Sequence, residues 1–268
     1  MLVDYHTHHD RCGHAVGGLE EYIQAAVKRG LGEIGFSDHQ PVIHLTPEQL
    51  LPEVAMTREQ LPEYVEEALR LQEQYKDEIV VRVGLEADWI EGYREPIREL
   101  LATYPFDYVI GSVHFLGEWD ITDYRQLEGW DSRDHAEVCR EYFRQIRLSA
   151  ESGLFDTLGH IDVVKRFGHI PAKLYEYLLE ETIAAIREAG VCVEVNTSGL
   201  RYKCEEQFPS RRLLEMMYSH GVPLTVGSDA HKPELVGEGL ETVVPLIKSV
   251  GYREVHGFVG RQRYAIEL

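Results

Sequence analysis

Residues 2–8 read Leu2-Val3-Asp4-Tyr5-His6-Thr7-His8, a short run with apolar and aromatic side chains that ends in two histidines. Side chains two apart in an extended segment project to the same face, so both imidazoles can reach one ion. The same arrangement, a short apolar run followed by a side chain of the metal-binding type, recurs along the chain. This recurrence predicts both the fold and the site.

Short apolar runs, which predict strands, alternate with longer amphipathic segments, which predict helices. The predicted strands cover residues 2–6, 33–37, 80–86, 108–114, 157–160, 191–196 and 224–228. The predicted helices include residues 19–29, 61–75, 93–101, 132–152, 172–189 and 209–220. The longer, Pro-containing connection at 40–59 is expected to lie over the mouth of the fold.

Seven strand–helix units without a Pro/Ser-rich linker predict one α/β domain, residues 1–268, built as a closed or nearly closed parallel barrel. The length of 268 residues suits such a barrel, which needs about 250. Hydrophobic residues make up 44% of the chain, enough for a substantial core, so disordered and fibrous classes are excluded.

The charge of the chain limits its partners. Its 27 Lys and Arg against 46 Asp and Glu give a formal net charge of −19, which repels nucleic-acid backbones and anionic membranes. We therefore expect no nucleic-acid or membrane partner. The four cysteines form no Cys-x-x-Cys pair, and the chain shows neither a signal peptide nor a long apolar run, so we expect a cytoplasmic protein with reduced thiols.

Nearly every predicted strand ends in a potential metal ligand. These groups are His6, His8, His14, His39, Glu86, His114, His160, Asp229 and His231. A barrel carries its chemistry at the C-terminal ends of its strands, so these distant positions are expected to converge. They exceed what one tetrahedral zinc needs and indicate two or three ions that share carboxylates, as in a multinuclear hydrolytic site.

Each of these residues also has a purely structural interpretation. A His-x-His pair can lie on a surface strand, Asp229 can cap a helix, and Glu86 can pair with an arginine such as Arg82. His114 and His160, taken singly, are typical of hydrogen-bonded core histidines. Their joint placement at one rim favours metal binding, because independent accidents rarely put so many ligands at one end of a barrel.

With these residues assembled, the sequence resembles the polymerase-and-histidinol-phosphatase (PHP) superfamily, and within it the monofunctional histidinol-phosphatase branch. The motifs that carry the superfamily resemblance are His6-Thr7-His8, Cys12-Gly13-His14, Phe36-Ser37-Asp38-His39, Gly84-Leu85-Glu86, Ser112-Val113-His114, Gly159-His160-Ile161-Asp162 and Gly227-Ser228-Asp229-Ala230-His231. The branch assignment rests on residues 111–116 and 194–201, which are less specific because related phosphoesterases share parts of them.

The resemblance implies a distorted (β/α)7 TIM-like barrel that holds three divalent transition-metal ions, Zn, Mn or Fe. The implied ligand sets are His6, His8, Glu86 and Asp229 for one ion, Glu86, His114 and His160 for a second, and His14, His39 and His231 for a third. Glu86, Asp229 and His231 are the implied catalytic residues. The implied reaction is hydrolysis of L-histidinol phosphate in histidine biosynthesis, with a hydroxide that bridges two ions attacking phosphorus.

Three ions would bring six positive charges against two ligand carboxylates, which would make the mouth of an acidic protein attractive to a phosphate ester. Basic residues just beyond strand ends are candidates for holding the phosphate: Lys165, Arg166, Arg201 and Lys203. Arg201 is preferred for its guanidinium fork, although it could instead pair with Glu205 or Glu206 on the surface. Phe115 offers an apolar surface for the organic end of the substrate, with Trp119 and an acceptor at Glu118 or Asp120 nearby.

Two other functions fit the same residues. A PHP phosphoesterase could act on another small phosphate or on nucleic-acid ends, since a barrel does not determine the substrate. A non-catalytic metal-binding module is the alternative outside enzymes, and the completeness of the ligand set argues against it. Metal identity and assembly into a homo-oligomer are not determined by these patterns.

Overall fold

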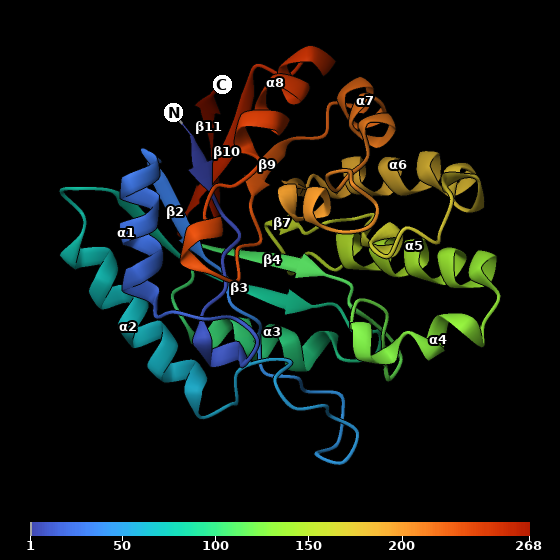
Figure 1. The fold of residues 1–268 in the computed structure, drawn as a ribbon, viewed down its shortest axis with the longest axis horizontal. Helices are drawn as coiled ribbons and strands as arrows, with labels where there is room; N and C mark the ends of the chain where they lie inside the picture. Colours follow the sequence, from blue (N-terminus) through green and yellow to red (C-terminus); the bar gives the residue numbers. More distant parts are fainter. Residues whose placement is uncertain (1) are drawn as a thin grey trace.

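Seven parallel strands form the centre of the molecule in the computed structural model, which describes residues 2–268. Their order in the sheet is β1-β2-β3-β4-β7-β8-β9 (Figure 1). Each strand therefore pairs with the next strand along the chain, except that a short separate hairpin lies between β4 and β7 in the sequence. The strands are β1 (Val3–Asp4), β2 (Glu33–Phe36), β3 (Val80–Asp88), β4 (Tyr108–Ser112), β7 (Thr157–Leu158), β8 (Cys192–Asn196) and β9 (Leu224–Gly227). All of their residues except Val80 and Arg82 are buried.

The two edges of this sheet curl round to meet. The Tyr5 N–H donates to the Val226 carbonyl at 3.0 Å, and Thr7 forms a parallel bridge with Ala230. These contacts join the first strand to the last, so the sheet is a nearly closed barrel. The predicted (β/α)7 TIM-like barrel is confirmed.

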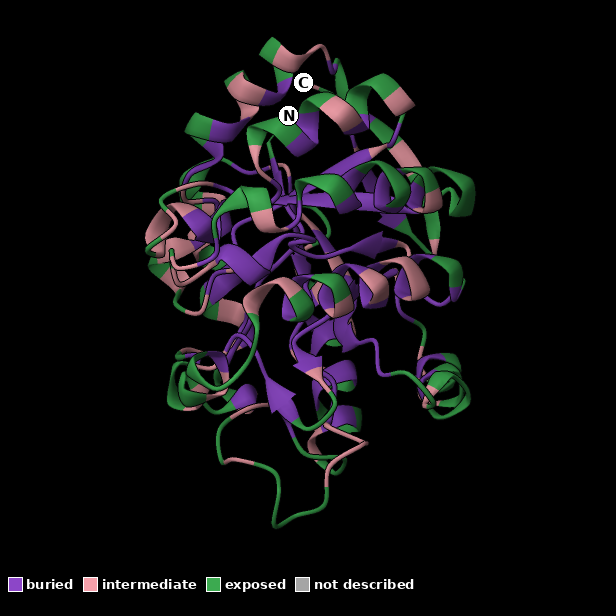
Figure 2. Ribbon diagram, turned by 90° about the vertical axis from the view of Figure 1, so that its right-hand side faces the viewer, coloured by how far each residue is buried: buried purple, intermediate pink, exposed green. Residues whose placement is uncertain are grey.

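Helices pack around the outside of the barrel with their exposed faces outward (Figure 2). They are α1 (Leu19–Arg29), α2 (Gln60–Gln74), α3 (Arg94–Thr103), α4 (Glu128–Asp131), α5 (His135–Glu151), α6 (Leu179–Ala189), α7 (Arg211–His220) and α8 (Leu240–Val250). In α1 the buried side chains recur at helical spacing, at Leu19, Tyr22, Ile23 and Ala26. None of the helices in residues 2–268 has the length and apolar character required to cross a bilayer.

Single-turn 3-10 segments shape the connections. They are η1 (Asp10–Cys12), η2 (Tyr124–Gln126), η3 (Val163–Lys165), η4 (Ala172–Leu174), η5 (Glu176–Leu178), η6 (Thr197–Arg201) and η7 (Pro233–Leu235). The predicted helix 172–189 was wrong in its first half, because Tyr175 has φ −132° and buries its ring against Phe143 at 5.3 Å between ring centroids. The predicted helix 132–152 begins later, because the Asp134 side chain accepts from the Ala136 N–H at 2.8 Å and caps α5.

Two antiparallel hairpins have no counterpart in the sequence prediction. β5 (Phe115–Leu116) pairs with β6 (Trp119–Asp120) next to the site, and β10 (Glu254–Val259) pairs with β11 (Gln262–Glu267). The second hairpin covers the N-terminal end of the barrel, where Phe258 packs on Tyr5 and Tyr108 with ring centroids 5.7 Å apart in both pairs. This end is therefore closed by aromatic packing, and the opposite end is left for the site.

Candidate metal centre

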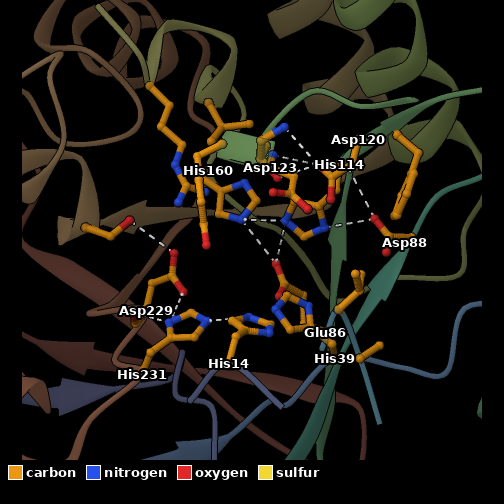
Figure 3. A pocket seen from close by; sticks show the side chains of 18 of the residues that line it. His14, His39, Glu86, Asp88, His114, Asp120, Asp123, His160, Asp229 and His231 are labelled. Carbon is orange, nitrogen blue, oxygen red and sulfur yellow. Dashed lines mark hydrogen bonds and ion pairs between the residues drawn. The ribbon is translucent and has the colours of Figure 1, made fainter. Parts of the chain in front are cut away.

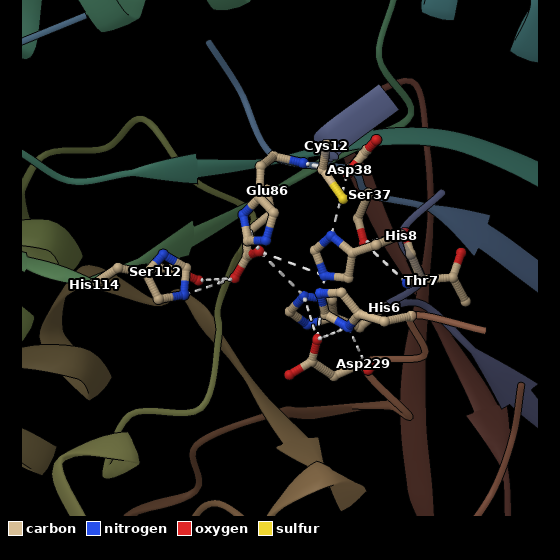
Figure 4. Close-up of polar contacts among 12 residues, drawn as sticks. His6, Thr7, His8, Cys12, Ser37, Asp38, Glu86, Ser112, His114 and Asp229 are labelled. Carbon is tan, nitrogen blue, oxygen red and sulfur yellow. Dashed lines mark hydrogen bonds and ion pairs between the residues drawn. The ribbon is translucent and has the colours of Figure 1, made fainter. Parts of the chain in front are cut away.

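The nine predicted ligands lie together at the C-terminal ends of the barrel strands (Figure 3; His6 and His8 in Figure 4). Seven of them, together with loop residues, line a cavity of about 350 Å³, and His6 and His8 lie next to it in contact with Glu86 and Asp229. All nine are placed either within a strand, as Glu86 is, or in the segment that follows one. A parallel barrel thus gathers residues that are far apart in the chain at one end.

Glu86, in β3, lies at the centre of the cluster. Its Oε1 is 3.1 Å from His160 Nε2 and 3.5 Å from His114 Nε2. Its Oε2 is 3.0 Å from His39 Nδ1 and 3.4 Å from His6 Nε2. His8 Nε2 lies 3.6 Å from the same Oε2. One carboxylate therefore faces five imidazoles, two on Oε1 and three on Oε2, which is the arrangement expected of a group shared between two ions.

Asp229, just after β9, faces His6 and His8, the histidines that follow β1 (Figure 4). Its Oδ1 is 3.1 Å from His8 Nε2 and 3.8 Å from His6 Nε2, and its Oδ2 accepts from Ser198 Oγ at 3.0 Å. The backbone of Asp229 has φ 53°, in the left-handed region that non-glycine residues rarely adopt. Such strain at a cluster of ligands is typical of functional positions.

Four groups of three side chains could each hold one ion, with candidate ligand atoms within 4.8 Å of one another. They are His8, His39 and His231; His6, Glu86 and His160; His6, His8 and Asp229; and His39, Glu86 and His114. His14 belongs to none of these groups, but its Nε2 lies 3.1 Å from His231 Nε2. The third predicted set is thus present as neighbours, with His8 closer to it than expected.

Unpaired buried atoms show that this donor set fits metal ions. His6 Nε2, His8 Nε2 and Glu86 Oε2 are buried, and within residues 2–268 none of them has a partner in hydrogen-bond geometry. An unpaired buried polar atom costs about 1–3 kcal/mol, so such atoms are rare in folded proteins. Here they point to a shared centre, and nitrogen and carboxylate donors together suit Zn, Mn or Fe.

The cluster also shifts the pKa values of its members. Burial would raise the pKa of the Glu86 carboxyl, but His6, His114 and His39 outweigh it and hold this pKa well below its usual value. Burial would lower the pKa of His114, but Asp88 and Glu86 raise it to about 10. Positive charge is therefore favoured around the carboxylates, and divalent ions would supply it in exchange for protons.

Three carboxylates that the sequence analysis did not single out contact the Nδ1 side of imidazoles in the cluster. They face Nδ1 at 2.7–3.3 Å in the pairs Glu194 with His6, Asp88 with His114 and Asp38 with His8. A carboxylate accepts a hydrogen bond from Nδ1–H, which keeps the proton on Nδ1 and leaves the lone pair of Nε2 free to bind a cation. The signal that could have identified them is an acidic residue within or directly after an otherwise apolar strand, as Glu194 is between Val193 and Val195.

The three predicted substrate contacts, Arg201, Arg166 and Phe115, all line the cavity. Arg201 donates to the Ser228 carbonyl at 2.7 Å and to Glu238 Oε2 at 3.2 Å, so it does not pair with Glu205 or Glu206. The Arg166 guanidinium stacks on the Tyr202 ring at 3.9 Å. Both arginines are therefore anchored at the edge of the cavity.

Two other basic candidates lie outside the cavity lining. Lys165 is buried and donates to Glu206 Oε2 at 2.7 Å and to the Gln207 carbonyl at 2.9 Å, so its charge is used within the fold. Lys203 is exposed and does not line the cavity. Of the four basic candidates for holding the phosphate, Lys165 is thus paired within the fold, because a strand-end position does not reveal where a long side chain turns.

The connection at 40–59 lies partly over the cavity, as expected. Val42, Glu53, Val54 and Ala55 line the cavity, while an exposed portion extends away from the barrel (Figure 2). Arg125, which the sequence analysis missed, also lines the cavity, and its Nη1 donates to the Pro52 carbonyl at 2.9 Å. This bond joins the connection to the segment after β6.

The sequence profile of the PHP domain matches residues 4–198. The chain belongs to the PHP family. Among PHP-family relatives, it is 37% identical to a probable histidinol-phosphatase of Deinococcus radiodurans over 95% of both chains. It is 31% identical to the histidinol-phosphatase of Bacillus subtilis, over 89% of this chain and 96% of the relative.

A solved structure of a histidinol phosphate phosphatase agrees with this assignment. The histidinol phosphate phosphatase of Lactococcus lactis, in complex with Zn, L-histidinol and phosphate, superposes with a TM-score of 0.85. The match covers 98% of each chain at 26% sequence identity. The barrel described above is thus the PHP fold over almost its whole length.

Proposed function

We propose that this PHP-family protein is a metal-dependent phosphomonoesterase that hydrolyses L-histidinol phosphate to L-histidinol and phosphate, a step of histidine biosynthesis. The observation that carries the proposal is the ring of imidazoles around Glu86, with buried nitrogen and oxygen atoms that have no hydrogen-bond partner among the described residues. The similarity to histidinol-phosphatases over nearly the full length supports the choice of substrate.

The centre would hold up to three divalent ions. Glu86 would be shared between one group on the side of His6 and Asp229 and another on the side of His114 and His160. The remaining ion would lie at His14, His39 and His231, with His8 close by. Divalent ions in such a site lower the pKa of water to about 7 and offset the charge of phosphoryl oxygens.

The residues of the chain would orient the phosphate ester. Arg201 and Arg166 lie at the edge of the cavity, where their guanidinium groups can hold non-bridging phosphoryl oxygens. Arg201 is fixed by backbone carbonyls of the same segment that carries Asp229. Binding of phosphate at Arg201 would therefore place the phosphorus next to Asp229 and His231.

The other wall of the cavity would receive the organic part of the substrate. Phe115 is buried there, with its ring against His44 at 4.8 Å between centroids. Asp120, also in the lining, is buried and accepts from the Thr122 hydroxyl at 2.7 Å. A flat apolar ring and a nearby carboxylate match an imidazole that carries an ammonium group. Trp119 packs instead against Trp130 and does not line this cavity.

The test compares phosphate release from L-histidinol phosphate and from p-nitrophenyl phosphate, with the metal content measured on the same sample. We expect bound transition metal and a kcat/KM for L-histidinol phosphate far above that for the chromogenic ester. Equal values for the two esters would favour a broad phosphoesterase. Bound metal without release from either ester would favour a non-catalytic metal-binding module.

A further inference from the structure

We infer that Glu194 is a positioning residue that couples the metal-binding groups on the two sides of Glu86. The inference rests on the metal centre proposed above. Glu194 lies in β8 and is 1% exposed, and its two carboxylate oxygens face different elements of the site. Through Oε1 it contacts the His6 side chain in the segment after β1, and through Oε2 the backbone of the segment after β7.

The Oε1 contact selects the tautomer of His6. Glu194 Oε1 lies 2.7 Å from His6 Nδ1, and a carboxylate can only accept, so this nitrogen carries the proton. The lone pair of His6 is therefore on Nε2. This atom is buried 3.4 Å from Glu86 Oε2 and has no hydrogen-bond partner in the part of the chain that the structure describes. Glu194 thus presents His6 in the form that can bind a cation.

The Oε2 contact holds the backbone at His160. Glu194 Oε2 accepts from the His160 N–H at 3.2 Å and from Asn196 Nδ2 at 3.0 Å. His160 has φ 24°, a strained value for a residue with a side chain, and its Nε2 lies 3.1 Å from Glu86 Oε1. The bond from Glu194 stabilises the backbone conformation that points this imidazole at Glu86.

A glycine on the neighbouring strand leaves the space that this carboxylate occupies. A Cβ on Gly227, in β9, would overlap Glu194 Oε1 and the Cβ of His6. Val193 and Val195 flank Glu194, and all three are buried. The carboxylate therefore occupies a fitted position in the barrel interior, between the two ligands it contacts.

Glutamine at this position has the same size but the wrong hydrogen-bond pattern. Three N–H groups point at the two oxygens of Glu194, from His6, His160 and Asn196. An amide has one accepting oxygen and one donating nitrogen. Its NH₂ group must either oppose two donors or force His6 into the tautomer whose Nε2 carries a proton. Either outcome weakens ion binding.

The experiment compares the wild type, Glu194→Gln and Glu33→Gln. Glu33 is a matched control, because it is 3% exposed at the opposite end of the barrel and accepts from the Tyr5 hydroxyl at 2.6 Å. Each protein is loaded with Zn²⁺ and dialysed against a chelator series, and the ions retained per chain and the Zn²⁺-induced rise in Tm are measured. We expect E194Q to bind two of its ions roughly 10–100-fold more weakly than the wild type, so that weaker chelators remove both together. We expect E33Q to retain its ions as the wild type does.

Other outcomes would overturn the inference. If E194Q retains the wild-type ions, or if its metal-free Tm falls while its Zn²⁺-induced rise stays unchanged, Glu194 has only a structural role. If E194Q does not fold, Glu194→Asp is measured. Its carboxylate is one methylene too short to reach both ligands, so wild-type ion retention would again overturn the inference. A wild type that binds no ions would contradict the proposed centre itself.

Discussion

His14 Nε2 and His231 Nε2 face each other at 3.1 Å, although 217 residues separate them in the chain. The Nδ1 atoms of both rings face backbone carbonyls, Glu53 O at 3.0 Å and Asp229 O at 3.1 Å. A carbonyl only accepts, so both protons are on Nδ1 and two lone pairs point at each other. A cation between the rings would turn this repulsion into attraction.

His14→Ala should therefore remove one ion and leave those around Glu86 in place. We expect elemental analysis by plasma mass spectrometry to find one ion fewer per chain than in the wild type. His256→Ala is the control, since His256 lies in β10 and faces the Leu224 carbonyl at 3.2 Å. An unchanged ion count in H14A would exclude His14 from the centre.

Glu86→Gln should disturb the groups on both sides of the centre. The carboxylate faces His39 at 3.0 Å and His160 at 3.1 Å, and the neutral amide has one accepting oxygen to replace two. If the transition state loses about 4 kcal/mol of stabilisation, phosphate release should slow by a factor on the order of 10³. We also expect at least two ions to be lost. Near-normal turnover with normal metal content would refute the central role of Glu86.

Arg201→Ala should raise KM for L-histidinol phosphate, because the guanidinium at the edge of the cavity would no longer contact the phosphate. Charge-assisted bonds contribute about 1.5–3 kcal/mol each, so we expect an increase of about 10-fold or more. Steady-state kinetics measure KM and kcat separately. Lys203→Ala, an exposed cation that does not line the cavity, serves as the control. Equal KM values in the two variants would remove Arg201 from substrate binding.

Removal of the ions with a chelator should abolish phosphate release and lower Tm. Ligand binding to the folded state adds about 2.7 kcal/mol of stability at a free ion concentration 100 times Kd. For a chain of this size that corresponds to roughly 5 °C or more in Tm. Calorimetry before and after chelation, and after Zn²⁺ or Mn²⁺ is returned, checks the expectation. A Tm that does not respond to chelation or to added ions would contradict it.

Tyr108→Phe should destabilise the barrel without changing KM. The Tyr108 hydroxyl, buried at the aromatic end, donates to the Tyr5 carbonyl at 2.7 Å and lies 3.1 Å from the Phe36 carbonyl. Loss of this buried donor should lower the free energy of unfolding by about 1–3 kcal/mol, as measured by urea denaturation. Tyr177→Phe, at an exposed position, is the control and should leave this free energy unchanged.

The sequence predicted the barrel and the convergence of the nine candidate ligands, because both follow from local patterns. Buried strands produce short apolar runs, amphipathic helices repeat their buried residues as α1 does, and parallel strands carry their following residues to one end. The hairpin of β10 and β11 was missed, since its strands expose residues such as Glu254, Val259 and Glu267 and lack a continuous apolar run.

The sequence by itself determined which residue types follow each strand, and therefore that a cluster of imidazoles and carboxylates forms at one rim. Only the tertiary structure decided which atoms face one another. Glu194 meets His6 across 188 residues, and Lys165 turns inward to Glu206 and away from the cavity. Contacts of this kind depend on strand register, glycine-sized spaces and side-chain rotamers, which are settled by packing in three dimensions and leave no periodic signal in the chain.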